Sequence, residues 1–555
     1  MNPRNVIRKW GGRTALAMLT LVLFAACHGL EELNENPNQL DTESVDPNLL
    51  ISTVINDIGK TIVNLGFGDM AGVMQHTQKD GWSGSHNSYD WTSESYNWSG
   101  FYQTLKNNQT MLEKAEAENL DFHTGAGLVL KSYLFGMITD LYGDAPYSGA
   151  LRGDQGAEFF DAPFDAQRDI YLGIFSDLER ANTLLSQDSY LNVEAGQDIL
   201  FGGDASKWRK LANSLALRYY MRLSEKEPQL AQQGIAKIVN SPGTYPLILS
   251  AADDANMGYV GNSSADSWPT NTVFDEDPQG AYMRIKMGKT LVDIMQDLND
   301  PRLGVWANRV AIPLAVEAGV GDDFDEVGDD GVRRVSQAIV DNYEATYGYP
   351  VDFDSDFVGY PTGMNLGAVY NLSEDPNQGT FNEHASQLND IYRQASGELL
   401  QARFMSATEI NFILAEAAFN GWIGGSTETY YNAAIQQSFN AWGVGGAYGA
   451  YIAGSAAYGD YEDIIVQKWI GSWSAATEAW FDYRRTGIPD LVPGPAARRT
   501  VLPIRFYYNE NELENNTENA EAAINNLETT DFTGTDPLNS AWSRMWLLQG
   551  TNKPY

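Results

Sequence analysis

A stretch near residue 90 combines aromatic rings with short polar side chains, and this combination suits the recognition of sugars. Residues 81–100 read GWSGSHNSYDWTSESYNWSG. Aromatic rings can stack on the C–H faces of a sugar, while amides and carboxylates satisfy its hydroxyls, and a ring loses little conformational entropy on binding. The residues that we predict to contact a ligand here are Trp82, Asn87, Tyr89, Asp90 and Trp91. The competing interpretation is core packing, which we favour for Trp98 at the start of a helix.

The same chemistry selects two turn-rich stretches further along the chain. Trp268 and Asn271 lie in the first of them, and Tyr347 and Tyr349 lie in the second. Gly, Pro, Asp and Asn are frequent around these residues, and long loops of this composition are commonly functional. We predict ligand contacts for these four residues as well, with core packing again as the alternative.

Three alternating aspartates offer a different chemistry, that of a hard cation. Asp352, Asp354 and Asp356 form an oxygen-rich stretch of the kind that binds Ca²⁺. An EF-hand is excluded, because Phe357 stands where the sharp turn needs glycine and Gly363 stands where a bidentate glutamate is required. We therefore expect either a weak Ca²⁺ site or a solvated acidic loop, and the sequence requires no cofactor.

The composition excludes several classes of function. The 555 residues include 36 Lys and Arg against 73 Asp and Glu, which gives a formal net charge of −37. Because nucleic acids bind basic surfaces, they are excluded as partners. The single cysteine excludes an internal disulfide and a zinc site of several thiolates, and none of the five histidines forms an HxxxH pair. The sequence also lacks the GxSxG motif of nucleophilic hydrolases and the glycine-rich motifs that bind nucleotides.

The first residues have the pattern of an export signal. Residues 1–26 combine a basic start with an apolar run that is too short to span a bilayer. The run ends in small residues directly before Cys27, as in a bacterial lipobox, although Phe24 stands where lipoboxes prefer leucine. We predict that Cys27 is lipidated and that residues 27–47 form a polar tether. An ordinary secretory signal with an incidental cysteine is the alternative.

Helical periodicity dominates the remainder of the chain. The predicted helices contain apolar stripes at 130–141, 170–185, 208–219, 404–419 and 431–442. Asp204 or Ser206 can cap the third of these helices. We predict a mainly α protein, in which paired tetratricopeptide-like helices at 48–240 and in the C-terminal part, 391–555, support an irregular, loop-rich ligand lobe at 241–390.

Four motifs in order along the chain resemble those of SusD/RagB-like outer-membrane lipoproteins. They are LYGDAPYS at 141–148, WRKLANSLALR at 208–218, EAWFDYRRTG at 478–487 and LPIRF at 502–506. Each motif alone is weak, but their order and spacing together are specific. The branch that the sequence resembles most is described as starch-binding and outer-membrane-associated.

The resemblance implies a function as well as a fold. It implies a surface-exposed lipoprotein, anchored in the outer membrane of a Gram-negative cell, that acts as a lid on a SusC-like TonB-dependent β-barrel transporter. It implies capture of a nutrient, usually an oligosaccharide and in some members a peptide, without catalysis. Arg484 and Arg485 lie within the third motif, but a buried arginine pair more often ties a helix end to carboxylates or carbonyls than it holds a ligand, so we do not expect them to bind one.

Two other functions remain open on the residues alone. A secreted glycoside hydrolase would need two carboxylates that flank the scissile bond, and 73 acidic residues supply such pairs by chance. A pure scaffold would use the helical hairpins to hold a partner protein. Sugar release distinguishes the hydrolase, and a stable complex without small-ligand affinity distinguishes the scaffold.

Overall fold

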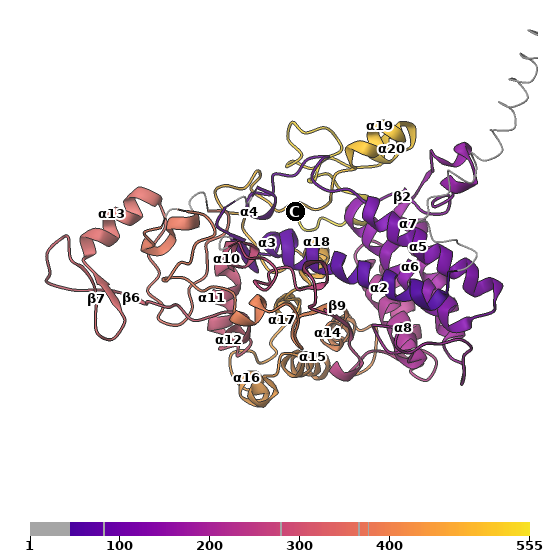
Figure 1. Cartoon of the computed structure of the whole chain (residues 1–555), viewed down its shortest axis with the longest axis horizontal. Helices are drawn as coiled ribbons and strands as arrows, with labels where there is room; N and C mark the ends of the chain where they lie inside the picture. The colour runs from indigo at the N-terminus through magenta and orange to yellow at the C-terminus, as the bar shows by residue number, and fades with distance from the viewer. Residues whose placement is uncertain (1–44, 82–83, 278–279, 365–366, 376) are drawn as a thin grey trace, which may run out of the picture. The chain divides into compact units, whose positions relative to one another are not determined.

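The computed structural model describes residues 45–81, 84–277, 280–364, 367–375 and 377–555 (Figure 1). Residues Met1–Asp46 and Pro47–Tyr555 are separate units, and the architecture below is that of the second. The predicted signal, Cys27 and nearly all of the predicted tether lie outside the described residues. Within the described part, no helix is both long and apolar enough to cross a membrane.

Six helices build the N-terminal scaffold, and each packs on the next or the next but one. They are α2 (Pro47–Val63), α5 (Ser99–Ala117), α6 (Asp121–Tyr142), α7 (Gln167–Leu184), α8 (Ala205–Arg222) and α9 (Pro228–Val239). The predicted stripes at 130–141, 170–185 and 208–219 are confirmed as parts of α6, α7 and α8. Asp204, and not Ser206, caps α8, because its carboxylate accepts the backbone N–H groups of Ser206 and Lys207.

Helix α6 is the centre of this scaffold. Helices α2, α5, α7 and α8 all contact it, so it is buried on nearly every side. Gly136 makes the contact with α8 close, because a Cβ at this position would lie 1.9 Å from the hydroxyl oxygen of Tyr219. The helix ends at Gly143, whose φ of 99° few other residues adopt.

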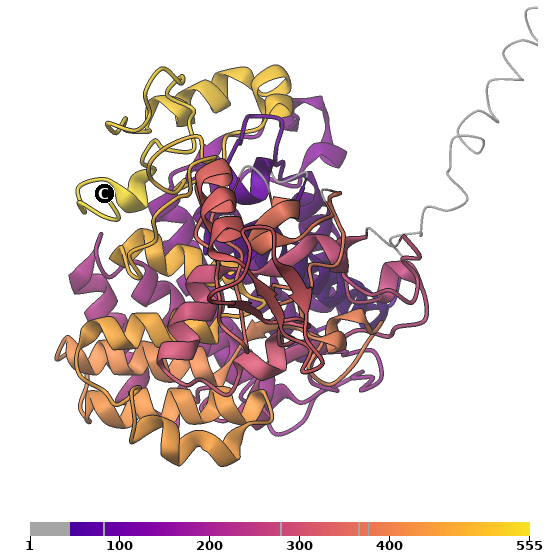
Figure 2. The same ribbon diagram turned by 90° about the vertical axis from the view of Figure 1, so that its left-hand side faces the viewer.

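A second set of paired helices lies in the C-terminal part. It contains α14 (Ala407–Phe419), α15 (Thr427–Ala441), α16 (Tyr448–Ile452), α17 (Tyr461–Gly471) and α18 (Ala476–Thr486). The helix predicted from residue 404 begins only at Ala407. Residues Gln401–Met405 instead form strand β9, which pairs with β4 (Ala255–Gly258), and the side chain of Ser406 then caps α14. Figure 2 shows these orange helices at the opposite end of the molecule from the yellow segment that contains α19 (Glu510–Asn515) and α20 (Thr517–Asn525).

Short elements make up most of the region between the two helical sets, as predicted. Its helices are α10 (Ala281–Arg284), α11 (Lys289–Asp297), α12 (Leu303–Trp306) and α13 (Gln337–Tyr347), and its small sheet joins β6 (Leu314–Val316), β8 (Arg333–Val335) and β7 (Asp325–Val327) in that order. Helix α13 was not predicted, because only Val340 and Tyr343 of its residues are buried and the apolar stripe is short. The other short elements are α3 (Met70–Val73), α4 (Gly84–Asn87), and the paired strands β1 (Thr77–Lys79) with β5 (Ile285–Met287) and β2 (Ala145–Pro146) with β3 (Phe164–Asp165).

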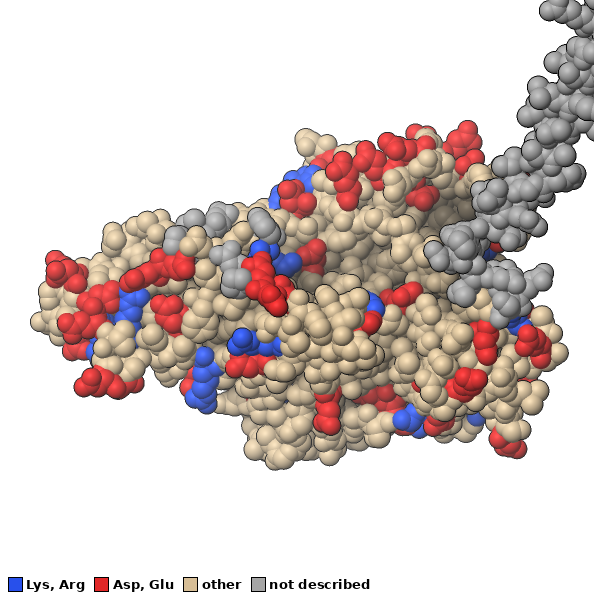
Figure 3. All heavy atoms as spheres, in the orientation of Figure 1, with Lys and Arg blue, Asp and Glu red and all other residues tan. Residues whose placement is uncertain are grey.

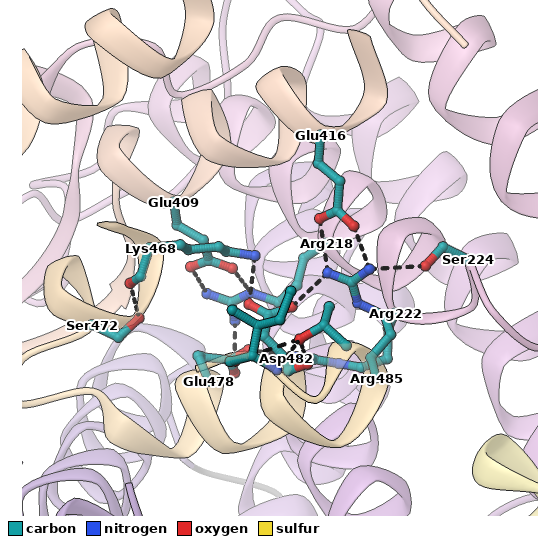
Figure 4. A network of polar contacts seen from close by, with 12 residues as sticks. Arg218, Arg222, Ser224, Glu409, Glu416, Lys468, Ser472, Glu478, Asp482 and Arg485 are labelled. Carbon is teal, nitrogen blue, oxygen red and sulfur yellow. Dashed lines mark hydrogen bonds and ion pairs between the residues drawn. The ribbon is translucent and has the colours of Figure 1, made fainter. Parts of the chain in front are cut away.

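A buried network of ion pairs joins the two helical sets (Figure 4). Arg218 of α8 forms two hydrogen bonds of 2.6 and 2.7 Å with the carboxylate of Glu409 on α14. Arg222, one turn later, pairs with Glu478 of α18 and with Asp140 of α6. Arg218 belongs to the motif at 208–218, and Glu478 belongs to the motif at 478–487. These two motifs therefore meet in the network, and their charged residues connect helices from both halves of the chain.

Arg484 and Arg485 have the structural role that we predicted for them. Arg484 donates to the backbone oxygens of Asp140 and Ile504, at 2.7 and 2.9 Å. Arg485 pairs with Glu416 of α14 and with Asp482. Burial alone would raise the pKa of Asp482, but Lys468 and Arg485 outweigh burial and hold this pKa well below its usual value.

Candidate ligand-binding site

The space inside the charged network is too small for a ligand. The cavity has a volume of about 20 Å³ and is lined by Arg218, Glu409, Lys468 and Glu478, among others. Such a volume holds about one water molecule. The network therefore stabilises the fold and is not a binding site.

The predicted aromatic cluster near residue 90 is largely buried, so the expected exposure of its rings is wrong. Tyr89 and Trp91 are fully buried, and Trp91 meets Trp480 and Phe506 edge-on at centroid distances of 5.8 and 5.2 Å. Asn87 is buried because its amide pairs with the backbone of Lys79 in both directions. Trp82 lies outside the described residues.

Asp90 is the member of this cluster that faces solvent. Its side chain is 69% exposed and lies 3.8 Å from a guanidinium nitrogen of Arg498.

The second group of predicted contacts is also mostly internal. Trp268 is fully buried among Phe67, Tyr259 and Tyr392. Asn271 is buried and uses its amide in a local turn, where it donates to the Trp268 oxygen and accepts from the Phe274 N–H. Tyr347 and Tyr349 are half-buried and pack against two separate small apolar clusters. The four residues therefore do not converge on one site.

The three aspartates of the acidic loop do not converge either. Asp352 pairs with Lys289 at 2.8 Å, and Asp356 pairs with Arg309. Asp354 accepts the backbone N–H groups of Asp356 and Phe357. Across the described ranges, no group of three His, Cys, Asp or Glu residues is placed to hold a metal ion. The prediction of a Ca²⁺ cluster at these residues is therefore not supported.

A pocket of about 470 Å³ lies beside the first turn of α5, within the size range of small-molecule sites. Three segments line it: the start of α5, the excursion at residues 146–162, and residues 509–516 around α19. Strands β2 and β3 pair at the base of the excursion and bring its two ends together. Asn516 then ties it to α19, because its amide donates to the Ala162 oxygen at 2.8 Å.

Aromatic side chains form one wall of this pocket. Phe160 is 67% exposed, which is unusual for so large an apolar side chain. Phe159 beside it carries the guanidinium of Arg152 over its ring, at 3.8 Å from the centroid. Tyr102 completes the wall, and burial raises the pKa of its hydroxyl well above the usual value, so the hydroxyl stays protonated and donates to the Pro146 oxygen.

Polar groups from distant parts of the chain form the floor. The indole N–H of Trp98 donates to a carboxylate oxygen of Glu512 at 3.0 Å. Asn509 is buried, and its side-chain oxygen caps α19 by accepting the N–H of Glu512. Asn97 and Asn511 add exposed amides at the rim. The pocket thus offers aromatic faces together with amide donors and acceptors, which is the chemistry that recognises a sugar.

A second pocket, of about 390 Å³, lies on the other flank of α19. Leu513, Ile524 and Leu538 give it an apolar lining, and Trp91 also borders it. Arg498 also lines this pocket, and its guanidinium donates hydrogen bonds to the backbone oxygen of Trp91 and to the carboxylate of Asp536. One backbone hydrogen bond, from the Glu510 N–H to the Ser93 oxygen at 3.1 Å, joins the two segments that line both pockets.

The surface beside the two pockets is acidic. Residues 509–527 contain five glutamates and no lysine or arginine, and the glutamates are Glu510, Glu512, Glu514, Glu518 and Glu521. Figure 3 shows the red acidic side chains along the part of the surface where Figure 1 places α19 and α20. Such a surface favours neutral or cationic ligands over anionic ones.

Comparison with known proteins places the chain in a family. The family model described as "SusD-like_2: Starch-binding associating with outer membrane" matches residues 37–339 and 344–509. The chain belongs to the SusD-like family. The resemblance drawn from the four motifs is thereby confirmed, and so is the mainly α SusD-like fold.

Solved structures of this family share the fold. A SusD homolog from Bacteroides fragilis is 24% identical, with a TM-score of 0.68, and the match covers 91% of this chain and 99% of that one. A chitin-binding SusD homolog from Flavobacterium johnsoniae is 20% identical, with a TM-score of 0.66, over 90% of this chain and 99% of that one. A comparison with curated protein sequences found no match.

The residues that line the larger pocket of this SusD-like protein were missed at the sequence level. Phe159 and Phe160 are adjacent in a short polar stretch that has neither helical nor strand periodicity. An aromatic pair in such a stretch could have been predicted as a binding feature, because the local sequence pattern does not indicate that the two rings are buried. Asn509 gave no comparable signal, since its neighbours in space lie some four hundred positions earlier in the chain.

Proposed function

We propose that this SusD-like protein captures a neutral oligosaccharide in the pocket between α5, the 146–162 excursion and α19. The observation on which the proposal rests is an aromatic wall, in which Phe160 is exposed and Phe159 half-buried, opposite a floor of amides and one carboxylate. The family description, starch-binding, and a chitin-binding relative support a glycan as the ligand.

The lining of the pocket favours binding without cleavage. Glycoside hydrolysis by the usual mechanisms requires two carboxylates on opposite sides of the scissile bond. Among the described residues that line the pocket, Glu512 is the single carboxylate. The protein therefore acts as a capture protein and not as the alternative secreted glycoside hydrolase.

Capture implies delivery, and we infer that the partner is a SusC-like TonB-dependent barrel in the outer membrane. The family is described as associating with the outer membrane. A diacylated Cys27 would anchor the protein there, at the cell surface, by the lipid chains alone. Copurification of the barrel with the tagged full-length protein tests this partnership, and recovery of the protein without any barrel contradicts it.

The function is tested by electrophoresis in native gels that contain soluble polysaccharides, with an assay for released reducing sugar. We expect retardation in at least one gel, no release of reducing sugar, and loss of retardation in Phe160→Ala. Phe419→Ala is the matched control, because Phe419 is also exposed but lies on α14, outside the pocket. Retardation of neither wild type nor variant, together with binding of peptides, would favour the peptide-capturing alternative, and sugar release would favour the hydrolase.

A further inference from the structure

The buried amide of Asn509 has a donor that the protein does not use. Asn509 is 3% exposed and lines the larger pocket. Its side-chain oxygen accepts the Glu512 N–H, and this bond determines which end of the amide faces the helix. The opposite end, Nδ2, has no hydrogen-bond partner.

The other buried polar groups around the pocket are satisfied within the protein. The Trp98 indole donates to Glu512, the Tyr102 hydroxyl to the Pro146 oxygen, and the Asn516 amide to the Ala162 oxygen. Buried donors are nearly always paired, and one that is not calls for an explanation.

Glu512 places an acceptor beside this donor. Asn509 and Glu512 occupy the N-cap and third positions of α19, one turn apart on the same side. One carboxylate oxygen of Glu512 accepts the Trp98 N–H, and no hydrogen bond among the described residues engages the other. The lining of the pocket therefore contains one unpaired donor and one unpaired acceptor.

We propose that Asn509 and Glu512 determine the specificity of the pocket for neutral glycans, an inference that rests on the proposed function. The Asn509 amide donates to a ligand oxygen, and the free Glu512 oxygen accepts a hydrogen from the same sugar. A sugar hydroxyl can accept and donate in this way, and so can an acetamido group through its carbonyl and its N–H. A uronate carboxylate can only accept, and it would face Glu512 in a surface with four further glutamates.

The variant that tests this proposal most directly is Asn509→Asp. Aspartate keeps the oxygen that caps α19 but replaces the donor with a second acceptor. Asn515→Asp is the matched control, because it adds the same charge to the same helix at an exposed residue that does not line the pocket. Glu512→Gln keeps an oxygen for the Trp98 N–H and removes the negative charge.

The test is calorimetric titration of wild type and variants with maltoheptaose, cellohexaose, chitohexaose and hexagalacturonate. We expect wild type to bind at least one neutral glycan and not hexagalacturonate. Asn509→Asp should lose at least tenfold in affinity while Asn515→Asp changes it less than threefold, and a cooperative melting transition in each variant should show that it is folded. Glu512→Gln should gain measurable binding of hexagalacturonate. Cellohexaose and chitohexaose differ only in the acetamido group, so a preference between them that Asn509→Asp abolishes would identify the group that contacts Asn509.

The outcomes separate the inference from the function on which it rests. If Asn509→Asp binds like wild type while Phe160→Ala does not, the pocket binds glycans but Asn509 does not determine specificity. If hexagalacturonate binds wild type as well as a neutral glycan does, or if Glu512→Gln gains no binding of it, the role of Glu512 is overturned. If no glycan binds wild type, the proposed function itself fails.

Discussion

Trp98 donates its indole N–H to the carboxylate of Glu512 across 3.0 Å, although 414 positions separate the two residues in the chain. Trp98 lies directly before α5, and Glu512 lies in α19. The bond therefore attaches an outlying C-terminal helix to the N-terminal scaffold. It also brings together two of the three segments that line the larger pocket, so the geometry of the pocket depends on it.

Replacement of Trp98 with phenylalanine should loosen this attachment. The variant keeps a ring in the aromatic contacts with Tyr102 and Tyr142 but loses the N–H donor. We expect a loss of about 2 kcal/mol in the free energy of unfolding, measured with urea, because a hydrogen bond to a charged group is removed. We also expect a several-fold weaker affinity for the bound glycan, because Glu512 is no longer oriented. Trp422→Phe, outside the pocket, is the control, and equal affinity of both variants would contradict the prediction.

Arg485→Met should be among the most destabilising single changes in the chain. It leaves Glu416 and Asp482 as buried carboxylates without their guanidinium partner. Removal of one member of a buried ion pair costs about 3–5 kcal/mol, which chemical denaturation would detect as a large fall in the midpoint. Arg334→Met removes a pair with Asp330 at the surface, in which Arg334 is half-buried and Asp330 exposed, and should change the midpoint little. Similar effects of the two substitutions would show that the buried network adds no special stability.

Asp254 should make the stability depend on pH. Burial raises the pKa of its carboxyl to about 7, and the carboxyl accepts the Ala407 N–H at the start of α14. The native state binds this proton more tightly than the unfolded state does. The stabilisation that comes from this difference is therefore fully present below about pH 4 and is lost as the pH rises through 7. Asp254→Asn keeps the acceptor oxygen and removes the charge.

The measurement for Asp254 is the difference in unfolding free energy between variant and wild type at several pH values. The unfolding free energy of the variant should match that of wild type near pH 4 and exceed it by about 2 kcal/mol at pH 8. This difference is smaller than the full pKa shift of Asp254 would give, because the side chain keeps some contact with water. A difference that does not change between these pH values would mean that Asp254 is already ionised in the native protein at low pH.

Cys27→Ser tests the predicted anchor. If the cysteine is diacylated, the variant should leave the membrane fraction of expressing cells and appear in soluble fractions, because serine cannot carry the thioether-linked acyl groups. Metabolic labelling with a palmitate analogue should mark the wild type and not the variant. Labelling of both proteins would place the lipid elsewhere, and labelling of neither would favour an ordinary secretory signal.

Much of the helical scaffold was predictable, because its signals are local. The stripe at 170–185 predicts α7, and Asp204 before the stripe at 208–219 predicts the start of α8, since both depend on residues within a few turns of one another. The predicted start of α14 was wrong because the signal that sets it is not local. Residues Gln401–Met405 pair with β4, about 150 positions earlier, and a non-local partner leaves no trace in the local pattern.

Composition, periodicity and ordered motifs by themselves determined the helical architecture and the SusD-like family of this protein. Tertiary structure alone decided which aromatic residues are open to solvent. Trp91 and Trp268 look like exposed binding residues in the sequence, yet both are core residues, while Phe160 remains open beside Asn509. The physical reason is that burial depends on what packs against a ring from elsewhere in the chain, as Phe506 does on Trp91. A residue's own neighbours in sequence do not specify that contact.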